Sequence, residues 1–293
     1  MPPQSARQPY LRRGLAAPCF AEDPTDLVDL AVAAEEAGFD GFFLWDHISF
    51  ANDGQGPPIV DPWAVMSVIA TRTSSIVIGP MITPVPRRRP WVLARQTATL
   101  DLLAGGRTVL GVGIGSPPHG DFGIFGDETD APARGAMLDE GLEVIAGLWS
   151  GETYSFEGDH YRVEPVRFLP TPVQRPGIPI WVGGVLPARR PMLRATRWQG
   201  AVPIRFADRV LARPSAQDIA DVADLVDTTR PGRDGYDLAV WAEVAPDPQQ
   251  LTTELPEYVQ AGATWWIETA KPEPGWFEGL QRRIAVGPVR HTG

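Results

Sequence analysis

Residues 76–116 read IVIGPMITPVPRRRPWVLARQTATLDLLAGGRTVLGVGIGS, and this stretch decides the fold. A β-branched run over 76–82 predicts a strand, which leads through a proline- and arginine-rich turn to an apolar-periodic helix over 90–103. A second hydrophobic run begins at Thr108 and ends in three alternate glycines. The order is strand, helix, strand, and the glycine-rich exit predicts a place where backbone lies against a flat ligand.

The same alternation continues through the chain. Strands are predicted at 11–17, 39–44, 76–83, 108–113, 179–183, 200–204, 238–243 and 264–268. Helices are predicted at 24–37, 62–73, 90–103, 133–149, 187–198, 215–228, 249–261 and 275–284. Eight strands, each followed by a helix, predict a parallel (β/α)₈ TIM barrel of the α/β class. The alternative is an open doubly wound sheet, which the count of eight disfavours.

The length supports one barrel with one insertion. The chain has 293 residues, and a barrel of this kind typically takes about 250. Residues 150–178 are the expected insertion, since they alternate like a hairpin and end in a proline-rich return. We expect residues 1–9 to form a flexible arm and residues 10–293 to form a single domain.

Composition excludes several classes of protein. No run reaches the roughly 18 apolar residues of a membrane span, and the N-terminus lacks a signal-peptide core, so we expect a soluble cytoplasmic protein. The net charge of −10 argues against nucleic acid or a membrane surface as partner. The one cysteine, Cys19, excludes an intrachain disulfide; it follows the first predicted strand, so it either fills a small buried core position or faces the site. The four histidines show no HxH or HExxH spacing, so no metal site is expected.

Active sites of these barrels form at the C-terminal ends of the strands. The candidates there are Trp45, Asp46, His47, Thr83, Gly113, Ile114, Gly115, Ser116, Glu243 and Glu268. His47 is the strongest, because an imidazole titrates near neutrality and can move a proton, with Asp46 beside it. The other interpretation makes Asp46 a loop cap and His47 a structural histidine. Aromatic side chains suggest an apolar pocket or else fill the core: Phe20, Trp45, Trp241, Trp265 and Trp266.

Positive charge is concentrated in two places. Arg87, Arg88 and Arg89 follow the third strand, while Arg189, Arg190, Arg194 and Arg197 follow the fifth. For each arginine a solvated surface position remains an alternative. The second cluster favours a phosphate site, because Gly183 and Gly184 end a strand just before a helix N-terminus. Arg189 and Arg190 lie in the first turn and are the expected phosphate ligands, whereas Arg194 and Arg197 are expected on the helix surface.

Several motifs resemble the bacterial luciferase-like flavin oxidoreductases, which use reduced FMN or the deazaflavin coenzyme F420. They are AEEAGFDGFFLWDHI (34–48), DPWAVMSVIATRTSSIVIG (61–79), TPVPRRRPWVLARQTATLDLLAGGRTVLGVGIG (83–115), GLEVIAGLWSGETYSFEGDHYRV (141–163), PVQRPGIPIWVGG (172–184) and GATWWIE (262–268). The resemblance runs from about Leu11 to Glu278. It is specific for the fold and the superfamily, and not for the substrate.

The resemblance implies roles for individual residues. His47 matches a histidine that transfers protons or stabilises the reduced cofactor, and Asp46 matches an acid that contacts the cofactor ring in many F420-dependent members. A non-prolyl cis peptide behind the ring is expected at Met81–Ile82. The resemblance implies cofactor-binding residues that, with their neighbours, are Trp45, Met81, Ile82, Thr83, Gly113, Ile114, Gly115, Ser116, Gly183 and Gly184. Arg189 and Arg190 are added as the expected ligands of the phosphate.

Two departures from the family pattern narrow the function. Ser116 stands where F420-dependent sugar-phosphate dehydrogenases carry a glutamate, and Ile114 stands where luciferase has a phosphate-binding arginine. We therefore expect a monooxygenase that uses reduced FMN, supplied by a separate flavin reductase, and O₂ on a small organic substrate. F420-dependent hydride transfer is the first alternative, and a non-catalytic flavin-binding protein is the second. Family members are often homodimers, so the resemblance implies a homodimer as well.

Overall fold

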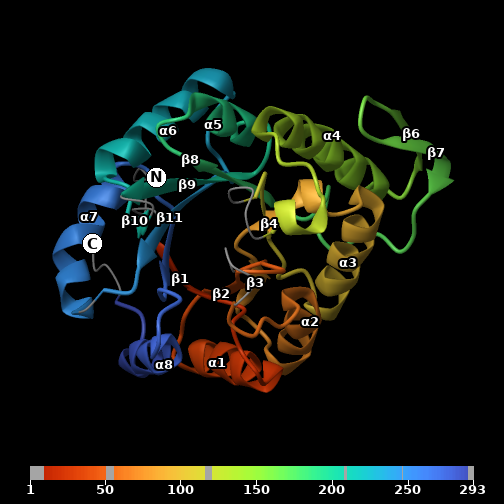
Figure 1. Ribbon diagram of the computed structural model, residues 1–293. Helices are drawn as coiled ribbons and strands as arrows, with labels where there is room; N and C mark the ends of the chain where they lie inside the picture. The colour runs from red at the N-terminus through yellow and green to blue at the C-terminus, as the bar shows by residue number, and fades with distance from the viewer. Residues whose placement is uncertain (1–9, 51–55, 116–120, 208–209, 246, 290–293) are drawn as a thin grey trace, which may run out of the picture.

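The computed structural model describes residues 10–50, 56–115, 121–207, 210–245 and 247–289. Its strands form a barrel with helices around it (Figure 1). The barrel strands are β1 (Arg12–Ala17), β2 (Gly41–Leu44), β3 (Val77–Pro80), β4 (Thr83–Pro84), β5 (Leu110–Gly113), β8 (Ile180–Val185), β9 (Gly200–Ala207), β11 (Asp237–Glu243) and β12 (Trp265–Thr269). The helices are α1 (Pro24–Glu36), α2 (Pro62–Arg72), α3 (Pro90–Leu103), α4 (Ala131–Trp149), α5 (Arg189–Ala195), α6 (Ala216–Thr229), α7 (Leu251–Gln260) and α8 (Trp276–Val286). The expected arm at residues 1–9 lies outside the described part.

The hydrogen-bonded order of the barrel is β3-β2-β1-β12-β11-β9-β8-β5-β4, and all these pairs are parallel. An isolated parallel bridge between Ile78 and Thr108 joins β3 to β5 and completes the circle. The TIM-barrel prediction is confirmed, and the open-sheet alternative is wrong. The predicted strand at 76–83 is divided into β3 and β4 at the cis peptide Met81–Ile82, which is where the resemblance placed it.

Short polar side chains define where several helices begin. Asp61 precedes α2 and accepts a hydrogen bond from the N–H of Ala64 at 2.9 Å, while a proline occupies the first helical turn. Asp130 does the same for α4 with the N–H of Ala133. An acceptor before the helix and a proline at its start satisfy or remove N–H groups that have no partner within the helix.

Aromatic rings fill the barrel interior where neighbouring strands carry glycine. The rings of Phe43, Trp181 and Trp265 lie with centroids 5.3–5.8 Å apart. A Cβ atom on Gly41 would lie 2.8 Å from both Phe43 and Trp265, so glycine is what admits these rings. Trp265 therefore belongs to the core rather than to a pocket. Trp266 faces outward instead, and its ring centroid lies 5.0 Å from that of Tyr258 on α7.

Two glycines bring β3 and β5 into close contact at the seam of the barrel. A Cβ atom on Gly79 would lie 2.0 Å from the carbonyl oxygen of Val109, and one on Gly111 would lie 2.3 Å from that of Pro80. No side chain fits into either space. The alternate glycines noted in the sequence at this point thus allow strand to approach strand.

A buried ion cluster joins the first barrel strand to the last. Glu268 of β12 is paired with Arg13 of β1 and Arg283 of α8, at 2.7 Å each, and all three side chains are buried. The prediction that Glu268 lies at the mouth of the barrel is wrong. Its neighbour Ile267 points into the barrel, and successive strand residues alternate between the two faces, so Glu268 points outward.

The predicted insertion forms an antiparallel hairpin of β6 (Thr153–Glu157) and β7 (Arg162–Arg167). It lies outside the barrel, against α4 (Figure 1). The hydroxyl of Tyr154 donates to the carbonyl of Glu143, and Glu140 accepts from the N–H groups of Asp159 and His160. The remaining elements are β10 (Val210–Ala212), which is antiparallel to β9, and the 3₁₀ turns η1 (Val85–Arg87), η2 (Gly123–Phe125) and η3 (Pro248–Gln250). None of the helices described is long and apolar enough to cross a membrane.

Candidate active site

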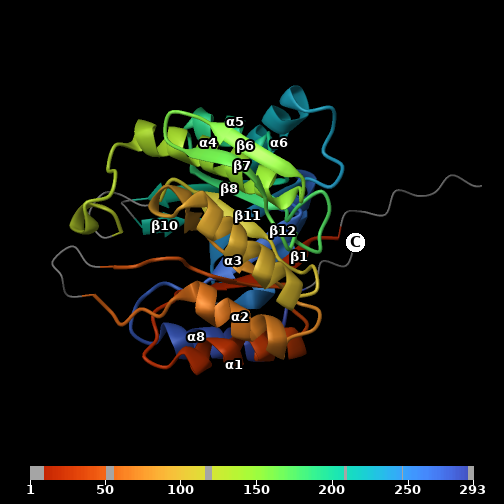
Figure 2. The same cartoon turned by 90° about the vertical axis from the view of Figure 1, so that its right-hand side faces the viewer.

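The C-terminal ends of the barrel strands and the segments after β2 and β5 lie on one side of the molecule, at the left of Figure 2. The floor of this mouth is aromatic. Trp45 at the end of β2 packs edge-on against Trp241 of β11, with centroids 5.9 Å apart, and Phe20 contacts Trp45 from the segment after β1. The indole Nε1 of Trp45 donates to Thr269 Oγ1 at 3.1 Å. Trp45 is thus held in a fixed orientation.

One polar atom in this floor has no partner. The Nε1 of Trp241 is buried and makes no hydrogen bond to any residue that the structure describes. A buried indole N–H usually finds an acceptor, since leaving it unpaired costs about 1–3 kcal/mol.

The glycines at the mouth contact protein side chains. Ile82 extends from the cis peptide over two strands, so that a Cβ atom on Gly183 would lie 2.1 Å from its Cδ1 and one on Gly113 would lie 3.2 Å from its Cγ2. Gly115, with φ of +86°, lies against the buried ring of Phe122 in the same way. The expectation that these glycines admit a flat ligand therefore needs refinement, because their open space is taken by side chains. Ile82 becomes the apolar surface in their place.

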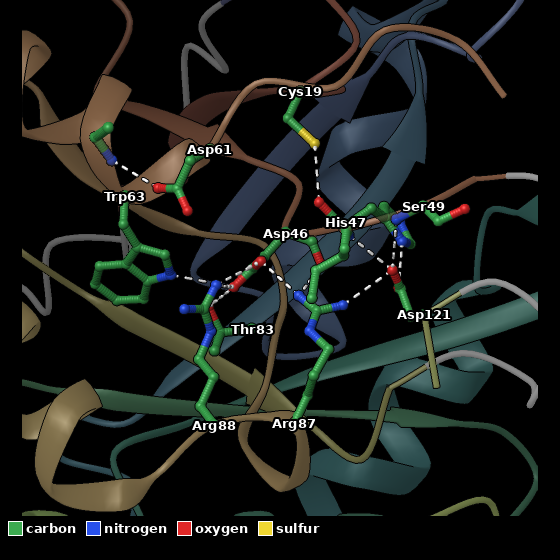
Figure 3. A network of polar contacts seen from close by, with 12 residues as sticks. Cys19, Asp46, His47, Ser49, Asp61, Trp63, Thr83, Arg87, Arg88 and Asp121 are labelled. Carbon is green, nitrogen blue, oxygen red and sulfur yellow. Dashed lines mark hydrogen bonds and ion pairs between the residues drawn. The ribbon is translucent and has the colours of Figure 1, made fainter. Parts of the chain in front are cut away.

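Asp46 turns away from the mouth into a polar cluster (Figure 3). Its carboxylate is buried and accepts from Trp63 Nε1 at 3.1 Å and from Thr83 Oγ1 at 2.7 Å. Arg88 donates to both of its oxygens at 2.8 Å, and Arg87 donates to Oδ1 at 2.7 Å. With five hydrogen bonds from protein groups, the carboxylate is engaged in joining β2 to α2, β4 and η1. The same contacts place Thr83 in the wall behind the site.

Arg87 connects Asp46 to a second buried carboxylate. Its Nη1 lies 2.9 Å from Oδ1 of Asp121, which follows β5 in sequence, and its own side chain is 2% exposed. The N–H groups of Ile48 and Ser49 also donate to this Oδ1, at 2.8 and 3.2 Å. The guanidinium thereby balances two carboxylates from different strand ends.

The second carboxylate oxygen of Asp121 holds His47. Nδ1 of His47 lies 2.6 Å from Oδ2 of Asp121, and the ring packs against Phe20, Trp45 and Phe50. Burial by itself raises the pKa of Asp121. The hydrogen bond and charge of His47, followed by the charge of Arg87, outweigh burial and leave this pKa below its ordinary value. The Nε2 atom of His47 has no partner among the described residues, so it is free to exchange a proton with a ligand.

The arginines after β8 fall into two groups, and this division matches the sequence prediction only in part. Arg189 and Arg190 are exposed at the start of α5 and form no ion pair within the described chain. Arg194 binds Asp139 of α4 at 2.8 Å and the carbonyl of Gly135, so it fixes α5 to α4 and is not a plain surface residue. Gly184 is required by packing, since a Cβ atom there would lie 2.2 Å from Pro191.

The structure brings together part of the predicted site. Ile82 lies against Gly113 and Gly183, His47 packs against Trp45, and Trp45 and Ile82 belong to the same inner cluster. Met81 is buried in the aromatic core below, and the carbonyl of Ile114 accepts from Arg134. Ser116 lies outside the described residues. Sequence reasoning missed Asp121, and it left open the structural role of Arg87 and Arg88; the only signal was that three adjacent arginines follow a strand whose neighbour ends in Asp-His.

Comparison with known proteins shows the family to which the chain belongs. F420-dependent glucose-6-phosphate dehydrogenase of Microbacterium testaceum is 36% identical over 96% of this chain and 90% of its own length. The corresponding dehydrogenase of Nakamurella multipartita is 32% identical over 90% and 85%. The coenzyme F420 dependent tetrahydromethanopterin reductase of Methanopyrus kandleri has a similar fold, with a TM-score of 0.75 and 16% identity over 95% of this chain and 98% of its own. Residues 5–246 match the sequence profile of the luciferase-like monooxygenases, and the chain belongs to this family.

Proposed function

We propose that the protein is an F420-dependent oxidoreductase that transfers a hydride between the deazaflavin and a small, uncharged organic substrate. The observation that carries the proposal is His47 at the mouth, where its ring packs against Trp45 and Phe50, its Nδ1 is held by Asp121, and its Nε2 has no partner among the residues that the structure describes. The relatives at 36% and 32% identity are both named for F420. They favour the deazaflavin alternative over the reduced-FMN monooxygenase that was our first expectation.

The residues present fit a flat, partly polar ring. Trp45 and Trp241 provide a rigid apolar surface. Arg189 and Arg190 are exposed and form no ion pair with any residue in the described part of the chain, and we propose that they bind a phosphate of the cofactor. These two arginines lie in a short helix, so their side chains rather than the helix terminus carry this assignment.

Bound F420 would supply the two-electron acceptor or donor for a hydride. The work of the protein is then to hold the substrate and to manage its proton. Nε2 of His47 accepts the hydroxyl proton when an alcohol is oxidised and returns it in the reverse reaction. The buried carboxylate of Asp46 accepts five hydrogen bonds from protein groups, so we assign it to positioning the β2 end rather than to direct contact with the ring.

The rim of the mouth favours an apolar, uncharged substrate. Large apolar side chains stand exposed on the segments after β2 and β5 and on β9: Ile48, Phe50, Ile124, Phe125 and Phe206. On the opposite side, Arg205 of β9, Arg213 and Lys271 are paired with acids, in the pairs Arg205–Asp218, Arg213–Glu254 and Lys271–Glu243. We do not extend the substrate named for the relatives to this chain.

Anaerobic titrations of the purified protein with F420 and with FMN, each oxidised and reduced, test the cofactor. We expect binding of F420 and at least tenfold weaker binding of FMN. Admission of air to the protein with reduced F420 should produce no oxygenated product. Tighter binding of reduced FMN, followed by oxygen consumption coupled to a substrate, would restore the monooxygenase interpretation.

Replacement of His47 by alanine tests the site. We expect kcat/KM to fall by about 10²–10⁴-fold, because a positioned acid–base group contributes this much, while F420 still binds. His160→Ala is the matched control, since His160 is exposed on the hairpin away from the mouth. A protein that binds F420 but reduces it with none of a panel of alcohols, glucose 6-phosphate included, would favour the non-catalytic alternative.

A further inference from the structure

The hydrogen bonds of Asp121 divide unequally between its two oxygens. Oδ1 receives the N–H groups of Ile48 and Ser49 and lies 2.9 Å from Nη1 of Arg87. Oδ2 contacts Nδ1 of His47 at 2.6 Å. One oxygen is thus engaged by two backbone N–H donors and by the charge of Arg87, and the other faces the imidazole.

We infer that Asp121 is a positioning residue that fixes His47 in the tautomer with the proton on Nδ1 and the lone pair on Nε2. An ionised carboxylate has no proton to donate, so the hydrogen bond at 2.6 Å requires the N–H on the imidazole side. Nε2 then reaches the mouth as an acceptor. The tautomer itself is inferred without the proposed function, and only its effect on catalysis rests on that function.

The charged groups around His47 support an ionised Asp121. Arg87 approaches from η1, and it shares its charge with Asp46 on the same strand end as His47. Cys19 approaches from the segment after β1, with its Sγ 4.0 Å from the carbonyl oxygen of His47. Burial raises the pKa of this thiol to about 12, so it stays neutral and adds no charge.

With this tautomer, His47 accepts a proton from the substrate at Nε2. A substrate hydroxyl at the mouth meets the lone pair of Nε2, and the proton it gives up makes an imidazolium. The positive charge is then held against the buried carboxylate of Asp121. The C–H electron pair leaves as hydride to the cofactor, so proton and electrons depart from the substrate to different acceptors.

Replacement of Asp121 by asparagine is expected to move the proton of the His47 imidazole from Nδ1 to Nε2. The amide oxygen keeps the N–H donors of Ile48 and Ser49, so the amide NH₂ must face Nδ1 of His47. Nδ1 is then forced to accept, and the proton moves to Nε2. A substitution of the acid by its isosteric amide therefore predicts the opposite tautomer with little change in shape.

The test is nitrogen NMR of the imidazole in protein labelled with ¹⁵N-histidine, assigned by comparison with His47→Gln. In the wild type at neutral pH, we expect His47 to show a protonated Nδ1 and an unprotonated Nε2, and in Asp121→Asn we expect the pattern reversed. Asp127→Asn, an exposed acid on the same segment, should leave the pattern unchanged. The wild-type spectrum tests the inference even if the variant fails to fold.

A wild-type His47 protonated on Nε2 instead, or a tautomer unchanged in folded Asp121→Asn, would overturn the inference. In turnover, Asp121→Asn should lower kcat by about 10²-fold with the KM for F420 changed less than about threefold, since geometry is kept while the tautomer is wrong. A reversed tautomer with full turnover would support the inference and contradict the role of His47 in the proposed function.

Discussion

Replacement of Arg87 by methionine removes the cation that two buried carboxylates share. The methionine keeps most of the length of the side chain, but the contacts of 2.7 Å to Asp46 and 2.9 Å to Asp121 are lost. Removing one partner of a buried ion pair costs about 3–5 kcal/mol. Asp46 retains both hydrogen bonds from Arg88, so we expect the lower limit, about 3 kcal/mol.

In a chain of this size each kcal/mol shifts Tm by about 2–4 °C, so the expected loss is about 6–12 °C by calorimetry at pH 7. Arg162→Met is the matched control: its pair with Glu164 is exposed at both ends, and it should shift Tm by less than about 2 °C. The pKa of Asp121 is lowered in the folded protein, so the difference between Arg87→Met and wild type should shrink as the pH falls below about 4. Equal Tm values for the two variants, or a difference that persists at low pH, would refute the reasoning.

Two further substitutions test the frame. Glu35→Gln should lower stability by about 1–2 kcal/mol at pH 7 in urea unfolding, because backbone N–H groups at residues 74–76 outweigh burial and lower the pKa of Glu35 to about 2. The loss of stability in Glu35→Gln should fade as the pH drops from about 4.3 towards 2. The control Glu36→Gln, at an exposed position, should show no effect. A loss of stability that is independent of pH would contradict the assignment. Gly79→Ala should destabilise by about 3 kcal/mol or more, since its Cβ would overlap backbone, while Gly279→Ala in α8 should be neutral or stabilising; equal stability of the two would contradict the close approach at the seam.

The barrel was predictable because its signals are local and repeat. Most barrel strands are short apolar runs, α1, α2 and α3 begin at a proline, and α4 and α6 follow Asp130 and Ser215. The break between β3 and β4 was also placed correctly, through the resemblance to a family. What the pattern could not supply is the direction of each side chain at a strand end.

Asp46 and Glu268 illustrate the difference. Both stand near the end of a barrel strand, but Asp46 points into the cluster around Arg87, and Glu268 points outward to Arg283. A shift of one residue exchanges the inner and outer faces of a strand, so a range that is right to within a residue still leaves the direction undecided. Asp121 was missed for another reason, since it follows no periodic element and only the tertiary fold brings it to His47.

The pairing of β1 with β12 sets the timing of folding. Ala16 and Thr269, which meet across this pair, are separated by 253 residues, so ribosomal synthesis at about 5–20 residues per second leaves β1 with an open edge for on the order of 10–50 s. Long-lived open edges recruit strands from other chains, and a charge on such an edge discourages it. Arg13 places a positive charge on β1 during this interval, and the charge is neutralised only when Glu268 of β12 arrives.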